Sequence, residues 1–149
     1  MRRVISISIR VIALIVLIGG AWYGSPLIFR TVAKYHLKTA ADRITADMDF
    51  ARQQSVMSGK PVVVTFDKEK STYSLTGVQE MYHTDGEYKV DLSSEPYNCR
   101  VVSTSFGILP RVVYGVPGTP FYGGEVVLQY GKYTCTVKVD SVNGKVTVQ

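Results

Sequence analysis

The chain has 149 residues, of which 46% are hydrophobic, and a formal net charge of +5. This length is enough for one folded domain with one core. All the excess charge lies in the first 38 positions, which hold six basic residues and no acidic one, whereas the rest of the chain is nearly neutral. A nucleic-acid-binding domain carries its basic surface on the folded part. The charge distribution therefore argues against nucleic acid as a partner and fits anionic lipid headgroups.

An uncharged apolar run covers residues 11–29. As a helix rising about 1.5 Å per residue, it spans roughly 28 Å, close to the hydrocarbon thickness of a bilayer. The run predicts a transmembrane segment after a cytoplasmic basic N-terminus at residues 1–10, because positive charges favour the cytoplasmic side. The protein would then be single-pass in the cytoplasmic (inner) membrane, with its C-terminal domain extracytoplasmic. A cleaved secretory signal is the alternative, with Gly19-Gly20-Ala21 as a small-residue cleavage site.

We expect the helix to continue beyond the membrane as an amphipathic extension over residues 30–58. Apolar residues recur there at intervals of four and three, which is typical of one helix face. This stripe, the predicted packing and assembly face, consists of Leu37, Ala41, Ile44, Met48 and Ala51. The helix should end at Ser58, because Gly59 suits a left-handed cap and Pro61 cannot continue a helix.

The remaining residues, 59–149, predict an antiparallel β domain. Apolar and polar residues alternate with period two, as in half-buried strands. The alternating runs lie at 62–66, 72–76, 87–92, 126–130 and 133–139, with a less regular run at 99–106 and a last short run after the turn Asn143-Gly144. We expect six or seven antiparallel strands from this pattern.

The apolar faces of these strands need a partner that covers them. The amphipathic half of the helix is the long partner available. The predicted fold is therefore α+β: a long N-terminal membrane-spanning helix packed on an antiparallel β-sheet. In this fold we expect one core in which Met48, Ala51 and Val56 meet the first strand.

The two cysteines, Cys99 and Cys135, allow two interpretations. In an oxidising compartment they could pair as a disulfide. Each could instead be a small buried apolar side chain. The sequence leaves both open.

Motifs for catalysis or ligand binding are weak. His36 and His83 lack the spacing of a zinc site, and the sequence has no Gly-x-Ser-x-Gly elbow and no phosphate loop. We expect no catalytic residue, no cofactor and no metal; a hydrolase that uses His83 is the remaining enzymatic alternative. The glycine- and proline-rich stretch at 114–124 is interpreted as a loop before a hairpin, or alternatively as a contact surface presenting Tyr114, Phe121 and Tyr122.

Two stretches resemble a known family. The first, residues 41–75, contains Ala51-Arg52, Val56, Gly59 and Val62-Val63-Val64, and the second, residues 123–148, ends near Gly144-Lys145-Val146. In this order they resemble the minor pseudopilins of the GspH/FimT type. The resemblance implies a non-enzymatic, pilin-like subunit of a type II secretion pseudopilus or a type IV pilus. Its partners would be the membrane and other pilin-like subunits, contacted through the N-terminal helix.

One family feature differs in this chain. Pilin-like precursors carry a glycine before the cleavage point and a glutamate five residues after it. With Pro26 aligned to the family's helix proline, Val4 and Ile9 stand at those positions. Whether the N-terminus is processed therefore stays open. An alternative function also stays open: a single-pass anchor that displays an extracytoplasmic β-domain, which binds a protein or ligand unrelated to any fibre.

Overall fold

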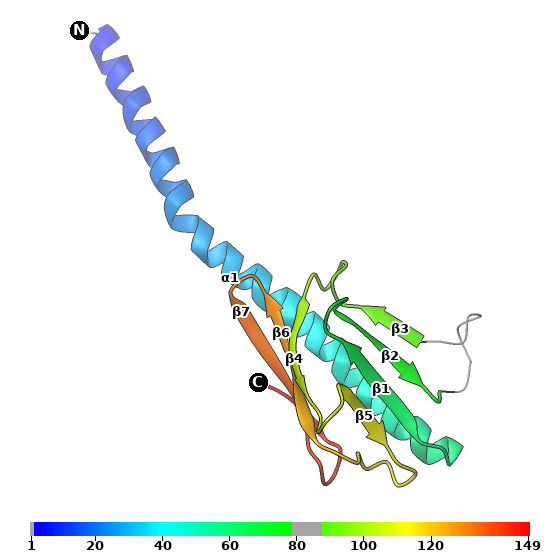
Figure 1. The fold of residues 1–149 in the computed structure, drawn as a ribbon. Coiled ribbons are helices and arrows are strands. Elements are labelled where there is room, and N and C mark those ends of the chain that lie inside the picture. The colour runs from blue at the N-terminus through cyan, green and yellow to red at the C-terminus, as the bar shows by residue number, and fades with distance from the viewer. Residues whose placement is uncertain (1, 79–87) are drawn as a thin grey trace. The chain divides into compact units, whose positions relative to one another are not determined.

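The computed structural model describes the backbone of residues 2–78 and 88–149, and the side chains of 28–78 and 88–149. Its first element is α1 (Arg2–Ser58), a helix of 57 residues. By their internal contacts, residues 1–33 form one unit and residues 34–149 form a second. The second unit holds the C-terminal part of α1 and the described strands (Figure 1).

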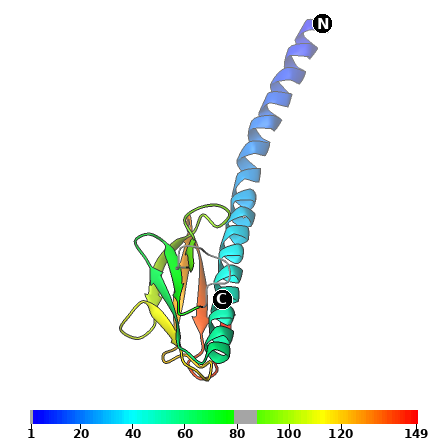
Figure 2. The same cartoon turned by 90° about the vertical axis from the view of Figure 1, so that its right-hand side faces the viewer.

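The strands of the second unit pair in antiparallel fashion and divide into two sheets. In the described residues they are β1 (Val62–Asp67), β2 (Thr72–Thr76), β3 (Tyr88–Asp91), β4 (Arg100–Ser105), β5 (Arg111–Tyr114), β6 (Gly124–Tyr130), β7 (Tyr133–Val139) and β8 (Val146–Val148). One sheet has the order β3-β2-β1-β5 and the other the order β4-β6-β7-β8. Figure 2 shows the C-terminal part of α1 running alongside these strands.

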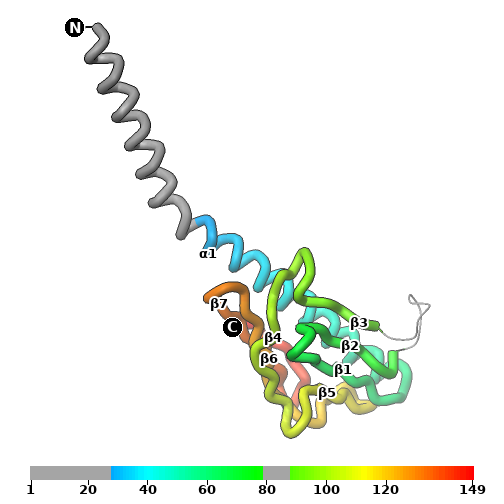
Figure 3. The backbone as a smooth tube through the Cα atoms, turned by 45° about the horizontal axis from the view of Figure 1, so that its top comes forward, coloured from blue at the N-terminus to red at the C-terminus, as the bar shows by residue number. Residues whose placement is uncertain are grey.

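This architecture confirms the predicted fold of a long helix packed on antiparallel strands. It differs from the expected single sheet in two respects. The described strands number eight, and they form two sheets because β5 pairs with β1 whereas β4 pairs with β6. The strand that the sequence did not predict is β5, which has only four residues and runs directly into the glycine- and proline-rich stretch. Figure 3 traces this path along the backbone.

The apolar stripe of α1 is covered by the sheets of its own subunit. Its members are at most 5% exposed and belong to the main apolar cluster, together with Ala40: Leu37, Ala41, Ile44, Met48 and Ala51. One further turn along, the buried position is Ser55 rather than Val56. The Ser55 hydroxyl donates a hydrogen bond to the Arg52 carbonyl at 2.7 Å, which satisfies the buried donor.

The expectation that Val56 lies in the core is therefore wrong. Val56 is 55% exposed. The stripe advances by four residues from Ala51, and this step reaches position 55, so Val56 is rotated away from the sheets. The other two predicted core residues of this helix segment, Met48 and Ala51, are fully buried.

The strands contribute the rest of the core, and β1 does so through strict alternation. Val62, Val64 and Phe66 on β1 are buried, while the residues between them are half-exposed. Phe66 also stacks on Phe106, which follows β4, with ring centroids 5.8 Å apart. This contact joins the two sheets in one apolar cluster.

The helix α1 ends at Ser58, as the sequence predicts. Gly59 adopts a φ of +63°, the left-handed conformation that terminates a helix at low cost. Pro61 follows, and β1 begins at Val62. The chain therefore turns from helix to strand within three residues.

Among the described residues, no helix is long and apolar enough to cross a bilayer. Of the predicted transmembrane segment at 11–29, the side chains up to residue 27 lie outside the described side chains. The transmembrane segment stays a prediction. The side chains of Val4 and Ile9, which stand at the family's glycine and glutamate positions, also lie outside the described side chains.

Candidate functional site

A buried carboxylate ties α1 to the first sheet. Asp47 is 7% exposed. The Tyr88 hydroxyl lies 2.9 Å from both carboxylate oxygens, and the Tyr73 hydroxyl donates to Oδ2. Arg43 donates from Nε to Oδ2 at 3.1 Å and from Nη2 to the Tyr88 hydroxyl. Because Tyr73 lies on β2 and Tyr88 on β3, this cluster fixes the helix on two strands.

The electrostatics of the cluster keep both tyrosines protonated. Burial raises the pKa of Tyr73, and the negative charge of Asp47 raises it further. The same two causes raise the pKa of Tyr88. Both hydroxyls therefore remain hydrogen-bond donors at neutral pH, and the donors and acceptors of the cluster satisfy one another. This arrangement positions α1 rather than a substrate.

The sequence analysis did not predict this cluster. Asp47 and Arg43 belong to the polar positions of an amphipathic helix, and that pattern does not distinguish a buried carboxylate from an exposed one. One signal was present: Asp47 directly precedes Met48 and follows Ile44 by three residues, so it lies at the edge of the apolar stripe.

A second contact anchors α1 to the other sheet. The His36 ring stacks on the Tyr130 ring, with centroids 4.7 Å apart and an interplanar angle of 9°. His36 Nδ1 also lies 2.6 Å from the Pro96 carbonyl oxygen and donates to it in the matching tautomer. His36 therefore joins the helix to the last residue of β6 and to the loop before β4. The other histidine, His83, lies outside the described residues.

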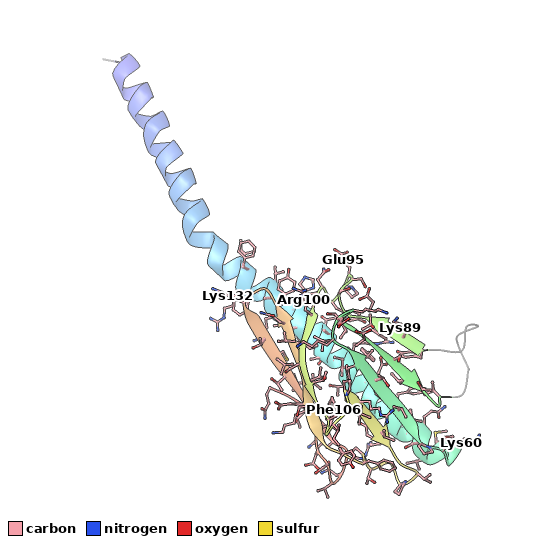
Figure 4. All side chains as sticks on the ribbon, in the orientation of Figure 1. Lys60, Lys89, Glu95, Arg100, Phe106 and Lys132 are labelled. Atoms are coloured by element: carbon pink, nitrogen blue, oxygen red, sulfur yellow. The ribbon has the colours of Figure 1, made fainter. Side chains whose placement is uncertain are left out.

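Exposed apolar side chains gather at the end of the second unit where α1 ends. We call this surface the apolar end face. It consists of Val56, Met57, Val116, Phe121, Tyr122 and Val142, each at least 47% exposed. Figure 4 shows this end of the unit, with Lys60 at the end of α1 and Lys132 at the opposite end.

Close contacts hold the segments of the apolar end face together. A Cβ built on Gly118 would lie 2.9 Å from Val56, so the loop after β5 runs directly against α1. Phe121 packs against Gly115, where a Cβ would lie 3.0 Å from the Phe121 ring, so the stretch after β5 folds back on itself. Apolar patches of this kind on a soluble domain mark interaction sites.

Of the three aromatic residues proposed for a contact surface, two are exposed and one is buried. Phe121 and Tyr122 are 63% and 66% exposed, on the apolar end face. Tyr114 is fully buried, so its predicted exposure is wrong. It belongs to β5 and pairs with Val62, and the alternation of that strand turns it to the same side as buried Val112.

The two cysteines are free thiols in the structure. Cys99 immediately precedes β4, and Cys135 lies on β7; β6 separates these strands. Two strand spacings amount to roughly 9–10 Å, whereas a disulfide needs Cα atoms within about 7 Å. The sheet therefore favours the second interpretation, in which each cysteine is a small buried or half-buried side chain.

In residues 28–78 and 88–149, no three histidine, cysteine, aspartate or glutamate side chains come together to hold a metal ion.

The fold of this chain is pilin-like. Solved structures with the same fold include the minor pseudopilin EpsH of the Vibrio cholerae type 2 secretion system, with a TM-score of 0.58 and 14% identity over 76% of this chain and 96% of that one. They also include the type IV minor pilin FimU of Pseudomonas aeruginosa, with a TM-score of 0.59 and 12% identity over 78% of this chain and 90% of that one. No curated protein matches in sequence.

The family follows from a second comparison. The family model described as type II transport protein GspH matches residues 40–144. The chain belongs to the GspH family. The match begins on α1 and ends at the turn before β8, so it covers most of the packed helix, the first sheet and three strands of the second sheet. The resemblance of the two stretches to minor pseudopilins is thereby confirmed.

Proposed function

We propose that this protein is a non-enzymatic subunit of a type II secretion pseudopilus or a type IV pilus assembly, anchored by its N-terminal helix. The observation that carries the proposal is the GspH family match over residues 40–144, together with the pilin-like fold. Two solved relatives in fold are described as a minor pseudopilin and a minor pilin.

The organisation of α1 supports the anchoring. The described part of the first unit, residues 2–33, is helix alone, and the uncharged run at 11–29 falls within it. An apolar helix of this length needs an apolar environment, which a bilayer or the helices of neighbouring subunits supply. In the proposed mechanism the segment resides in the inner membrane and then packs against other pilin-like subunits, with the β domain extracytoplasmic.

The assembly contacts must come from the side of α1 that its own sheets leave uncovered. The stripe from Leu37 to Ala51 is buried within the subunit. Tyr35 and Phe50 are 63% and 43% exposed on the same helix. We therefore assign the packing role to the stripe and the assembly role to this outer side and to residues 11–29.

Purification from membranes tests the proposal. The full chain should be extracted only with detergent and should copurify with other pilin-like subunits. Recovery as a soluble, monomeric mature protein that lacks residues 1–29 would contradict it.

A second candidate function rests on the apolar end face. A single-pass anchor that displays the β domain to a binding partner would also account for the exposure of Phe121 and Tyr122. Crosslinking distinguishes the two functions. Capture of other pilin-like subunits from the outer side of α1 favours the fibre, whereas capture from the apolar end face alone favours the displayed domain.

A further inference from the structure

A groove opens on the apolar end face between the last turns of α1 and the loop after β5. Its volume is about 310 Å³, and it is lined by Arg52, Gln53, Val56, Met57, Pro117 and Gly118. The lining is mainly apolar, with one guanidinium and one carboxamide. This composition suits an apolar side chain accompanied by a group that accepts hydrogen bonds.

Two glycines shape the position of Arg52 in this groove. A Cβ on Gly118 would lie 3.4 Å from Arg52 Cγ, and a Cβ on Gly144 would lie 3.4 Å from Arg52 Cδ. The aliphatic stem of Arg52 thus packs against both glycines, which have φ of +77° and +68°. A Cβ on Gly144 would also lie 3.3 Å from the Gly118 carbonyl oxygen, so the two glycines adjoin each other beside this stem.

Polar groups beside the groove lack hydrogen-bond partners among the described residues. Arg52 Nε is buried and donates no hydrogen bond; its nearest charged neighbour is Asp49 Oδ1 at 4.0 Å. The hydroxyl of fully buried Tyr114 likewise has no partner there. Burial raises the pKa of Tyr114, the charge of Asp49 raises it further, and the charge of Arg52 lowers it, so the hydroxyl lies within electrostatic range of both. Unsatisfied buried donors are uncommon and call for an explanation.

The surroundings of the groove are basic. The segments around the groove carry three basic residues and two acidic ones: Arg52, Lys60 and Lys145 against Asp49 and Asp140. Asp140 already accepts hydrogen bonds from the backbone N–H groups of Val142 and Asn143, at 2.7 and 3.1 Å. These bonds lower its pKa and hold it in its own turn. The positive excess favours an acidic partner.

We propose that this groove binds an extended acidic segment of a partner protein, with a large apolar side chain against Val56, Met57 and Pro117 and a carboxylate on Arg52. The inference goes beyond the proposed assembly role, because it assigns a second binding surface that does not involve the N-terminal helix. The carboxylate would pair with the exposed part of the Arg52 guanidinium, since the Arg52 side chain as a whole is 41% exposed. A charge-assisted hydrogen bond of this kind is stronger than a neutral one.

The test uses the full chain in detergent micelles and two synthetic peptides. One peptide alternates leucine with glutamate, and the matched peptide has lysine in place of each glutamate. Backbone amide NMR signals of Gly118, Gly144 and Met57 should shift on titration with the glutamate peptide only. Arg52→Met keeps the aliphatic stem and removes the charge, and it should weaken binding about tenfold.

Two further variants keep the test decisive. Met57→Ser alters a residue that is 81% exposed, so it should weaken binding without affecting the fold. Lys68→Gln removes an exposed charge in the turn between β1 and β2 and should leave binding unchanged.

Three results would overturn the inference. They are equal binding of the lysine peptide, no shift at the groove up to about 5 mM peptide, and self-association through the groove without any peptide. None of them concerns contacts made by the N-terminal helix, so a failure here leaves the proposed assembly role standing.

Discussion

At the scale of single residues, the placement of α1 depends on Asp47. Its carboxylate accepts hydrogen bonds from a tyrosine on each of two strands and from Arg43 on its own helix. Removal of one partner from such a buried cluster leaves the remaining groups unsatisfied, which costs more than the pairing itself contributes. Asp47 is therefore a sensitive point of the fold although it is a polar residue on a surface helix.

Asp47→Asn should lower the free energy of unfolding by about 2–3 kcal/mol, because it removes the charge that Arg43 and the two tyrosines share. Asp42→Asn is the matched control. Asp42 is exposed and lies 4.0 Å from Lys38 in an i, i+4 pair, so its loss should change stability by less than about 0.5 kcal/mol. Denaturant unfolding of both variants measures the difference. Equal effects would show that the cluster does not hold the helix.

A second prediction at this scale concerns Cys99. Burial, and to a lesser extent the charge of Cys135, raises the pKa of the Cys99 thiol to about 11. Below the ordinary thiol pKa, near 9, the group is protonated in both states. As the pH rises from about 9 to 11, the unfolded state ionises first, so the free energy of unfolding should fall, by about 1 kcal/mol at pH 10.

The comparison variant is Cys99→Ala. Its free energy of unfolding, measured between pH 8 and 10, should lack the part of the decrease that the Cys99 thiol causes. Mass analysis with and without reductant gives the companion result: two free thiols. A native disulfide would remove the titration and would require the strands around β6 to lie differently.

At the scale of elements, the match between the α1 stripe and the sheets dominates the energetics. Met48 is fully buried, whereas Met57 is 81% exposed on the same helix. Met48→Ala should lower the free energy of unfolding by about 2–5 kcal/mol, because it leaves a cavity in the core. Met57→Ala should change it by less than about 0.5 kcal/mol. Thermal unfolding of the two variants compares them directly, and a Met48→Ala protein as stable as the parent would mean that the sheets do not cover the stripe.

Much of the element structure follows from local sequence patterns. The end of α1 follows from Gly59 and Pro61, and the faces of β1 and β7 follow from alternation. The burial of Met48 follows from helical spacing. In each case the signal lies within a few residues of the position that it predicts.

The features that could not be predicted depend on pairing between distant segments. The four residues of β5 become a strand because β1 offers an edge, and this same pairing buries Tyr114. The division into two sheets arises in the same way, since β4 pairs with β6 across the whole of β5 and its loops. The apolar end face likewise depends on loops from separate parts of the chain meeting at Gly118 and Gly144. Period-two and helical patterns carry no information about contacts between segments that are distant in the sequence.

At the scale of the whole molecule, the second unit has two exposed surfaces to which we assign different proposed roles. The sheets cover one side of α1 and leave its outer side exposed. The apolar end face is a second surface, with a mainly apolar groove that contains Arg52. In the proposed assembly the helix provides subunit packing, while the end face remains available for a partner protein.

The most direct test of the assembly role is photo-crosslinking in the cells that produce the protein. A photoreactive residue replaces Tyr35, which is 63% exposed on α1, or Met48, which is buried under the sheets. The account predicts crosslinked products with other pilin-like subunits from position 35 and none from position 48. The contradicting result would be no crosslinked product with such subunits from position 35 while the chain is present and folded. It would mean that α1 does not assemble this protein into a pilus-like fibre.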